Sequence, residues 1–252
     1  MIESYHHDPD IHELRLNRPP ANALNPELLA ELRARLEEAQ GKGARAIVLS
    51  GLPGMFSAGL DVPYLITLDR AGIEAAWSEF LATVEALVRS PVPVVAAITG
   101  HSPAGGAVLS LACDHRLMAK GDFTIGLNEV RLGIPMPRFM FEMARLAMGQ
   151  RRAEIACVSG HLFRPEEALA SGFVDHLTEP DEVVPKAVEH CRRLLQLPAA
   201  AYAGSRASGR HDLQELFDRL DPDAGARLTE VWFSDETQAA LRGLVERLRR
   251  EC

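Results

Sequence analysis

Three loop segments of this chain combine the small and acidic residues that a proton-transfer site needs. They are FSAGLD at residues 56–61, GHSPAGGA at residues 100–107 and IGLNEVRLG at residues 125–133. Each is expected to follow a buried strand, and α/β proteins place their ligands at that end of the strands. We therefore expect the three segments to meet at one site.

Glu129, in the third segment, is the main candidate for a catalytic side chain. It is set among Leu127, Val130 and Leu132. If its carboxylate faces a closed apolar pocket, the loss of hydration raises its pKa and makes it a useful proton carrier. The alternative is a surface glutamate paired with Arg131 or another arginine, and the residues alone leave both interpretations open.

The other two segments can offer backbone N–H groups to an oxyanion. Small side chains in the first segment let a ligand approach the backbone closely. The second segment leads into a predicted helix, whose first N–H groups lack partners and carry partial positive charge. Asp61 is either catalytic or the cap of a turn or helix, and His101 is either a base or a bystander.

The elements that must position these loops alternate between strand and helix in the first half of the chain. Strands are predicted at residues 11–17, 46–49 and 92–99, with one or two more within residues 117–125. Pro26 begins a helix capped by Asn25, and two further helices are predicted at residues 70–89 and 103–113. After Pro135 the patterns are almost all helical, at residues 139–148, 151–158, 165–171, 181–195, 211–219 and 236–251. This order predicts an α/β core followed by a helical C-terminal part.

The net charge and the absence of certain motifs argue against several classes of protein. The net charge of −8, from 27 basic and 35 acidic residues, disfavours a nucleic-acid binder but permits an anionic small molecule. The sequence has no phosphate loop, nucleophile elbow, HExxH or GxGxxG motif. Its longest apolar runs are too short to span a bilayer, so no membrane partner is expected.

The cysteines fit no metal or redox spacing, and no metal site is expected. They are Cys113, Cys157, Cys191 and Cys252. Cys113 and Cys157 lie in apolar surroundings that are typical of small core residues. A reducing compartment suits such thiols, and the polar N-terminus has no apolar signal core, so we expect a cytoplasmic protein.

Taken in order, five segments resemble the crotonase (enoyl-CoA hydratase/isomerase) family. They are PPANALNPEL at 19–28, FSAGLD at 56–61, VPVVAAITGHSPAGGAVLSLACD at 92–114, FTIGLNEVRLG at 123–133 and ALASGFVD at 168–175. The resemblance implies an α/β fold of the crotonase type, a spiral of ββα units followed by a helical region that drives trimer formation. It divides the chain into a core at 1–195 and a helical region at 196–252. A homotrimer or a dimer of trimers is the expected assembly.

The resemblance also implies an acyl-CoA thioester as the partner, with coenzyme A as part of the substrate and no further cofactor. The N–H groups of Leu60 and Gly105 would hold the thioester oxygen, and Glu129 would move the proton. The remaining residues expected to contact the substrate are Ala21, Asn22, Ala23, Ser57, Ala58, Gly59, Asp61, Pro103, Ala104, Gly106, Asn128 and Ile134. The apolar residues Ile134, Met136, Phe139 and Met140 are expected to form the pocket wall beyond Glu129.

One departure from the family's hydratases points to a particular reaction. Those enzymes use a second glutamate, whose position is held by Val108 here. With one carboxylate left, the simplest chemistry is removal and return of a proton, and the loops are most similar to those of mitochondrial-type Δ3,Δ2-enoyl-CoA isomerases. The alternatives are a hydratase-like or other reaction of the family (acyl-CoA hydrolysis or decarboxylation), or a non-catalytic acyl-CoA binding protein.

Overall fold

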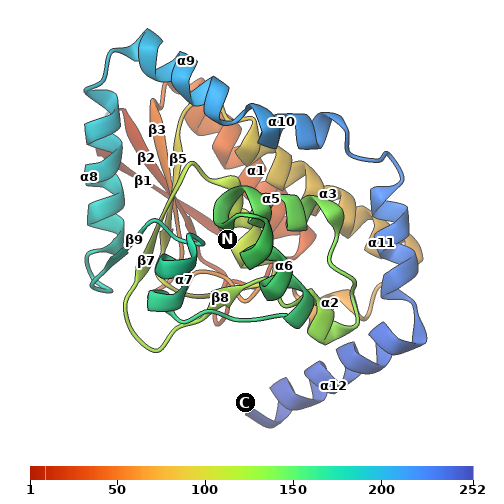
Figure 1. Cartoon of the computed structure of the whole chain (residues 1–252). Helices are drawn as coiled ribbons and strands as arrows, with labels where there is room; N and C mark the ends of the chain where they lie inside the picture. Colours follow the sequence, from red (N-terminus) through yellow and green to blue (C-terminus); the bar gives the residue numbers. More distant parts are fainter. Residues whose placement is uncertain (9, 252) are drawn as a thin grey trace.

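A six-stranded sheet forms the centre of the computed structural model, which describes residues 1–8 and 10–251 (Figure 1). The strand order is β1-β2-β3-β5-β7-β9. The first pair is antiparallel and all later pairs are parallel. The strands are β1 (Ile2–Asp8), β2 (Ile11–Leu16), β3 (Ala46–Ser50), β5 (Val94–Ile98), β7 (His115–Ala119) and β9 (His176–Thr178). Strands β3 and β5 are buried throughout, which explains their continuous apolar sequence.

A second, smaller sheet lies within the three loops. Its parallel strands are β4 (Gly54–Met55), β6 (Gly100–Pro103) and β8 (Ile125–Gly126). Each follows a strand of the main sheet, and a helix comes next, so the chain repeats a strand-strand-helix turn. This arrangement confirms the predicted α/β spiral of ββα units.

Two helices of the core begin at residues whose side chains cap their first turns. Helix α1 (Pro26–Gly41) starts where the side chain of Asn25 accepts a hydrogen bond from Leu28 N at 3.0 Å. Helix α3 (Arg70–Val88) starts at a similar cap on Asp69. Helix α4 (Gly105–Ala112) is buried along its whole length, and α8 (Val183–Leu195) covers the opposite face of the main sheet.

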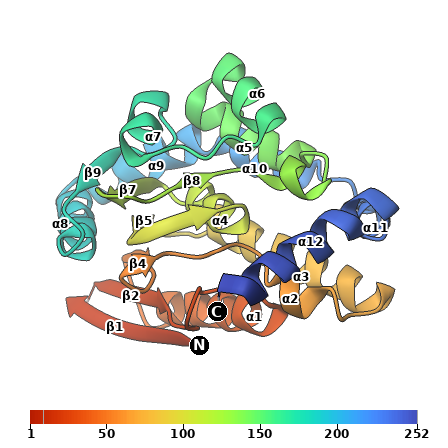
Figure 2. The same ribbon diagram turned by 90° about the horizontal axis from the view of Figure 1, so that it is seen from below.

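The C-terminal helices wrap around this core (Figures 1 and 2). Arg206 and Arg210 anchor them, because both guanidinium groups bind the carboxylate of Asp114, at 2.8 and 3.1 Å. The remaining helices are α2 (Val62–Leu65), η1 (Glu129–Leu132), α5 (Arg138–Met148), α6 (Gln150–Ser159), α7 (Pro165–Ser171), α9 (Ala199–Gly209), α10 (His211–Asp218), α11 (Ala224–Trp232) and α12 (Asp235–Glu251). None of the described helices has the length and apolar character that crossing a membrane requires.

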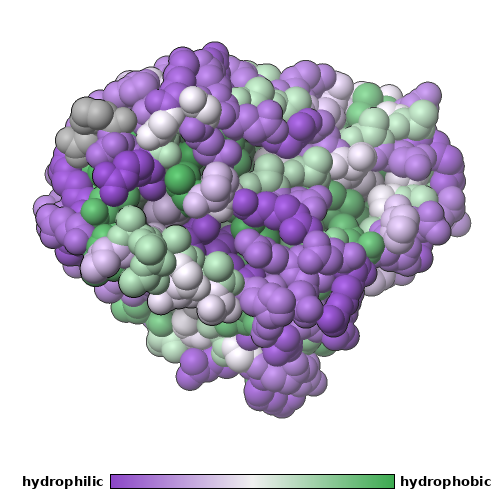
Figure 3. All heavy atoms as spheres, turned by 90° about the horizontal axis from the view of Figure 1, so that it is seen from above, coloured by the Kyte–Doolittle hydropathy of each residue, from purple (hydrophilic) through white to green (hydrophobic). Residues whose placement is uncertain are grey.

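The thiols of Cys113, Cys157 and Cys191 are free and buried, as small core residues are expected to be. Cys252 lies outside the described residues. The face seen from above in Figure 3 is largely hydrophilic, with smaller groups of hydrophobic residues between. Most of the large apolar side chains of the described residues are buried in the core.

Candidate active site

Two of the three loops touch at a pair of glycines. A Cβ atom on Gly59 would lie 3.1 Å from the nitrogen of Gly105 and 3.1 Å from the carbonyl oxygen of Pro103. Gly59 also has φ +84°, a left-handed conformation that glycine adopts without strain. A residue with a side chain at this position would force the loops apart.

The N–H group of Leu60 is available to a ligand. Leu24 forms a parallel bridge with Leu60, in which Leu24 N donates to Gly59 O at 2.8 Å and Asp61 N donates to Leu24 O at 3.0 Å. Since successive residues of an extended chain point in opposite directions, the N–H of Leu60 points away from Leu24. No described residue accepts a hydrogen bond from it.

The N–H group of Gly105 is available for a different reason. Gly105 is the first residue of α4, and the first N–H groups of a helix have no partner within it. The preceding residue, Ala104, has φ 48° and ψ −122°, a rarely populated conformation for a residue with a side chain. Strain of this kind concentrates at functional sites, where the surrounding structure sustains it.

Glu129 is buried, with 5% of its surface exposed. Its Oε2 atom has no hydrogen-bond partner among the described residues, and neither has Oδ1 of Asn128. Burial raises the pKa of the Glu129 carboxyl to about 7. The alternative of an ion pair with Arg131 is therefore wrong, because no salt bridge joins the two side chains.

These groups line one cavity of about 340 Å³. Of the predicted site residues it brings together Ala58, Leu60, Pro103, Ala104, Gly105, Asn128, Glu129 and Ile134. Met140, which was expected in the wall beyond Glu129, also lines the cavity. The other lining residues come from α2, α3, η1, α11 and α12 and were not predicted as site residues. They are Val62, Trp77, Phe80, Arg131, Leu132, Trp232, Leu244 and Arg247.

The other predicted residues lie outside the cavity lining. The side chain of Asn22 is fully buried: it accepts from Arg18 N at 2.8 Å and donates to Phe56 O at 3.0 Å. Ser57 Oγ donates to Asn22 O at 2.8 Å. These bonds hold the loop after β2 against the first segment. Ala21, Ala23, Gly59 and Gly106 are likewise outside the cavity lining.

Asp61 caps a helix. Its carboxylate accepts from Tyr64 N at 3.1 Å, in the first turn of α2, and forms an ion pair with Arg18 at 2.6 Å. Asp61 is also absent from the cavity lining, so the structure favours capping over catalysis. Its predicted contact with the substrate stays a prediction.

His101 is a bystander. Its Nδ1 lies 3.2 Å from both the hydroxyl and the backbone nitrogen of Thr124, and its ring packs edge-on against Phe123. It does not line the cavity.

Met136 and Phe139, which we expected in the pocket wall beyond Glu129, line a different groove between α5 and the C-terminal helices.

The cavity lining holds few charges. Among the described residues that line it, Glu129 is the one carboxylate, and the guanidinium groups of Arg131 and Arg247 are the cations. Val108 is fully buried in α4 and does not reach the cavity. Within the described part of the chain, no cluster of three or more His, Cys, Asp or Glu side chains could hold a metal ion.

Solved structures with a similar fold cover nearly the whole chain. A crystal structure of human mitochondrial delta3-delta2-enoyl-CoA isomerase is 30% identical in sequence and has a TM-score of 0.93, covering 99% of this chain and 98% of that one. A crystal structure of the probable enoyl-CoA hydratase EchA3 of Mycobacterium tuberculosis is 28% identical, with a TM-score of 0.81 and 98% of each chain covered.

Known sequences agree with this comparison. Enoyl-CoA delta isomerase 1 of the rat is 38% identical over 94% of this chain and 83% of that protein, and the human protein is 33% identical over 94% and 80%. The match to the mouse protein, at 39% identity, spans 73% of this chain and 65% of its relative. The enoyl-CoA hydratase/isomerase family matches residues 7–250. The chain therefore belongs to the enoyl-CoA hydratase/isomerase family, which the order of its loop motifs had indicated.

Proposed function

We propose that this protein is a Δ3,Δ2-enoyl-CoA isomerase, which moves the double bond of a 3-enoyl-CoA to the conjugated 2-trans position during fatty acid β-oxidation. One observation carries the proposal: Glu129 is the single carboxylate among the described residues of the cavity wall, and its Oε2 has no partner. A double-bond shift needs one group that takes and returns a proton. Hydration also needs a water to be activated, usually with help from a second acid or base, and Val108 cannot supply one.

The geometry supports a two-step proton transfer. The thioester oxygen binds the N–H groups of Leu60 and Gly105, each typically contributing about 3 kcal/mol to stabilising an enolate-like transition state. Glu129 takes a proton from C2 and returns it at C4. Its pKa of about 7 is well matched to this task, because a proton carrier works best when its pKa lies near the operating pH.

The coenzyme would extend from the cavity along residues 21–23 and 58–60. Its phosphates need cations, and Arg131 and Arg247 are the two on the cavity wall. Both side chains are exposed, and neither forms an ion pair or hydrogen bond with a described residue. Most other arginines are paired with carboxylates, so these two are the best candidates for binding phosphate.

The names of the relatives support an isomerase reaction and also identify hydration as the main alternative reaction. The mammalian relatives are named enoyl-CoA delta isomerases. A relative in Mycobacterium tuberculosis, 37% identical over 81% of this chain and 77% of that protein, is named a probable enoyl-CoA hydratase, EchA17. The decisive test must therefore separate double-bond migration from hydration.

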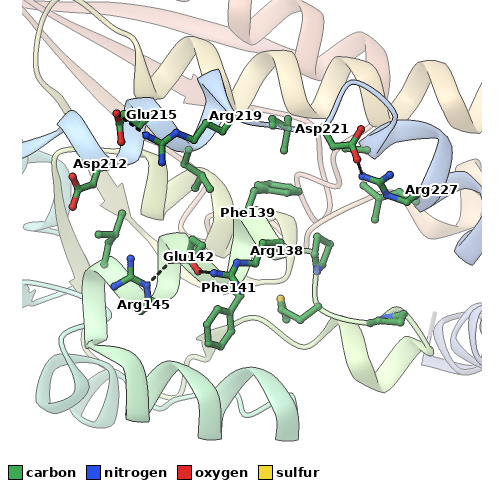
Figure 4. A pocket seen from close by; sticks show the side chains of 18 of the residues that line it. Arg138, Phe139, Phe141, Glu142, Arg145, Asp212, Glu215, Arg219, Asp221 and Arg227 are labelled. Atoms are coloured by element: carbon green, nitrogen blue, oxygen red, sulfur yellow. Dashed lines mark hydrogen bonds and ion pairs between the residues drawn. The ribbon is translucent and has the colours of Figure 1, made fainter.

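We also propose a homotrimer or dimer of trimers. A groove of about 990 Å³ between α5 and helices α10–α11 is a suitable interface (Figure 4). Apolar side chains such as Phe141 and Leu216 line it, and charged groups surround them. These charges occur as ion pairs, Glu142 with Arg138 and Arg145, Glu215 with Arg219, and Asp221 with Arg227. An apolar groove with a charged rim has the anatomy of a protein interface.

The first experiment mixes the protein with 3-hexenoyl-CoA and follows conjugation at the enoyl-thioester absorbance band. Glu129→Gln is measured alongside, with Glu246→Gln on the exposed face of α12 as the matched control. The wild type and the control should conjugate the substrate, and Glu129→Gln should not. In a second cuvette, 2-trans-hexenoyl-CoA should keep its absorbance, since hydration would remove it. Binding without conjugation would overturn the proposal.

A further inference from the structure

A second, very small cavity lies beside the catalytic one. Its volume is about 10 Å³, and its lining is apolar: Leu60, Leu65, Ile73, Ala76, Trp77 and Trp232. Three of these side chains, those of Leu60, Trp77 and Trp232, also line the catalytic cavity. They form the partition between the two spaces.

The tryptophans are the bulk of this partition. Trp77 lies on α3 and Trp232 at the end of α11, and 3% and 2% of their surfaces are exposed. Their rings meet edge to face, with centroids 6.4 Å apart and an angle of 81°. Trp77 makes a similar contact with Phe80 at 6.1 Å. Aromatic rings prefer this arrangement, so the partition is a packed and ordered wall.

We propose that Trp77 and Trp232 set the upper limit on the length of the acyl chain. The inference rests on the proposed function, because it takes the acyl group of the thioester to be the occupant of the catalytic cavity. Most of the side chains that line the cavity are apolar, with Phe80, Met140 and Leu244 among them as well as the tryptophans, and such a lining suits a hydrocarbon tail. The tail therefore ends against the indole rings.

The small cavity behind the indole rings could accept additional methylene groups of the acyl chain if either ring were replaced by a smaller side chain. Leu65, Ile73 and Ala76 offer only apolar atoms there, so a longer hydrocarbon tail would enter without leaving a polar group unpaired. A smaller side chain at position 77 or 232 would join the two cavities. Each additional methylene buried is worth about a fourfold gain in affinity.

The test compares the wild type with Trp77→Phe and Trp232→Phe, and with Trp77→Leu if it folds. Phe173→Leu, a buried aromatic substitution outside both cavities, is the control. kcat/KM is measured for a series from 3-hexenoyl-CoA to 3-tetradecenoyl-CoA. The tryptophan variants should raise the ratio of long-chain to hexenoyl kcat/KM by about tenfold or more, the gain expected from two or three added methylenes. The control should change all lengths alike.

A binding experiment tests the proposed limit on acyl-chain length independently of the proposed isomerase reaction. The chain has two tryptophans, and both are in the partition, so its tryptophan fluorescence reports on this wall alone. Titration with saturated octanoyl-CoA should change the emission strongly, and acetyl-CoA much less. Unchanged chain-length profiles in the variants, or equal emission changes for short and long acyl groups, would overturn the inference. Failure of the wild type to conjugate any 3-enoyl-CoA, with length-dependent emission intact, would instead overturn the isomerase.

Discussion

The hydroxyl of Thr237 donates a hydrogen bond of 2.8 Å to the carbonyl oxygen of Gly133, four residues after Glu129. Gly133 has φ +72°, and a Cβ atom there would lie 3.1 Å from the Cα of Thr237. Ile134 N in turn donates to Glu129 O at 3.2 Å. These contacts form a clamp that holds the first turn of α12 against the short η1 turn, which carries the carboxylate of Glu129.

Thr237→Val should disturb this clamp while keeping the shape of the side chain. The substitution removes the hydrogen bond to the partly buried carbonyl of Gly133 and the one that Thr237 Oγ1 accepts from Ser234 Oγ at 3.0 Å, which should lower the free energy of unfolding by about 1–3 kcal/mol. Because the clamp positions Glu129, kcat should fall while KM changes little. Thr237→Ser keeps the hydroxyl and should restore kcat. Urea unfolding and steady-state kinetics test both effects, and a normal kcat in Thr237→Val would show that α12 does not position the carboxylate.

The pH dependence of catalysis should follow the Glu129 carboxyl. Glu129 must be ionised to take a proton, and burial raises its pKa to about 7. kcat/KM should therefore rise with pH and level off above about pH 7, since kcat/KM reports the free enzyme. A curve already flat from about pH 5, near the ordinary range of a carboxyl group, would mean that Glu129 is hydrated or is not the base.

Glu129→Gln should stabilise the protein while abolishing turnover. A carboxyl whose pKa rises from 4.5 to about 7 on folding binds its proton more tightly in the folded state. At low pH the carboxyl is protonated in both the folded and the unfolded state, so the raised pKa does not change the free energy of unfolding. As the pH rises from about 4.5 through about 7, the free energy of unfolding falls. A neutral amide avoids this loss, which amounts to about 3 kcal/mol at most. Urea unfolding of both proteins at pH 8 and at low pH should show a gap only at the higher pH.

Arg247→Ala should weaken binding of the coenzyme. A charge-assisted contact to phosphate is worth about tenfold in affinity, so KM for 3-hexenoyl-CoA should rise about that much while kcat stays near the wild-type value. Arg249→Ala, on the same helix but outside the cavity wall, is the control. With the pantetheine thioester, which lacks the nucleotide phosphates, Arg247→Ala and the wild type should perform alike. An equal loss with both substrates would place Arg247 elsewhere in the reaction.

The residues alone pointed to the three loops, because a small-residue loop after a buried strand and a glutamate among apolar residues are visible within a few positions. They left the role of Glu129 open. The resemblance to the crotonase family singled out Glu129, Leu60 and Gly105, and these three do line one cavity. The aromatic part of the wall was missed for a physical reason. Helical periodicity in residues 70–89 predicts that Trp77 is buried, no helix was predicted over Trp232, and no local pattern shows that the two rings meet. Two residues so far apart in the chain meet only through tertiary packing.

Some elements were missed because their sequences carry little periodic signal. Strand β1 (IESYHHD) is an edge strand with many polar residues, and helix α9 (AAAYAGSRASG) has no buried residue. Strands β4 and β8 have two residues each, too few for any pattern. The predicted helix at residues 103–113 begins at Gly105, because the residues before it pair with β8. The division at residue 195, the trimer and the cytoplasmic location remain predictions.

The order in which the chain is made gives the anchoring of the C-terminal helices a further meaning. Synthesis proceeds from the N-terminus, and a domain generally folds as a unit. Glu129 and both N–H donors are made long before Trp232, Leu244 and Arg247, which complete the cavity. Without α11 and α12 the carboxylate of Glu129 would be open to water, which keeps the pKa of a carboxyl group near its ordinary range. The proposed proton transfer therefore depends on the helices that are synthesised last.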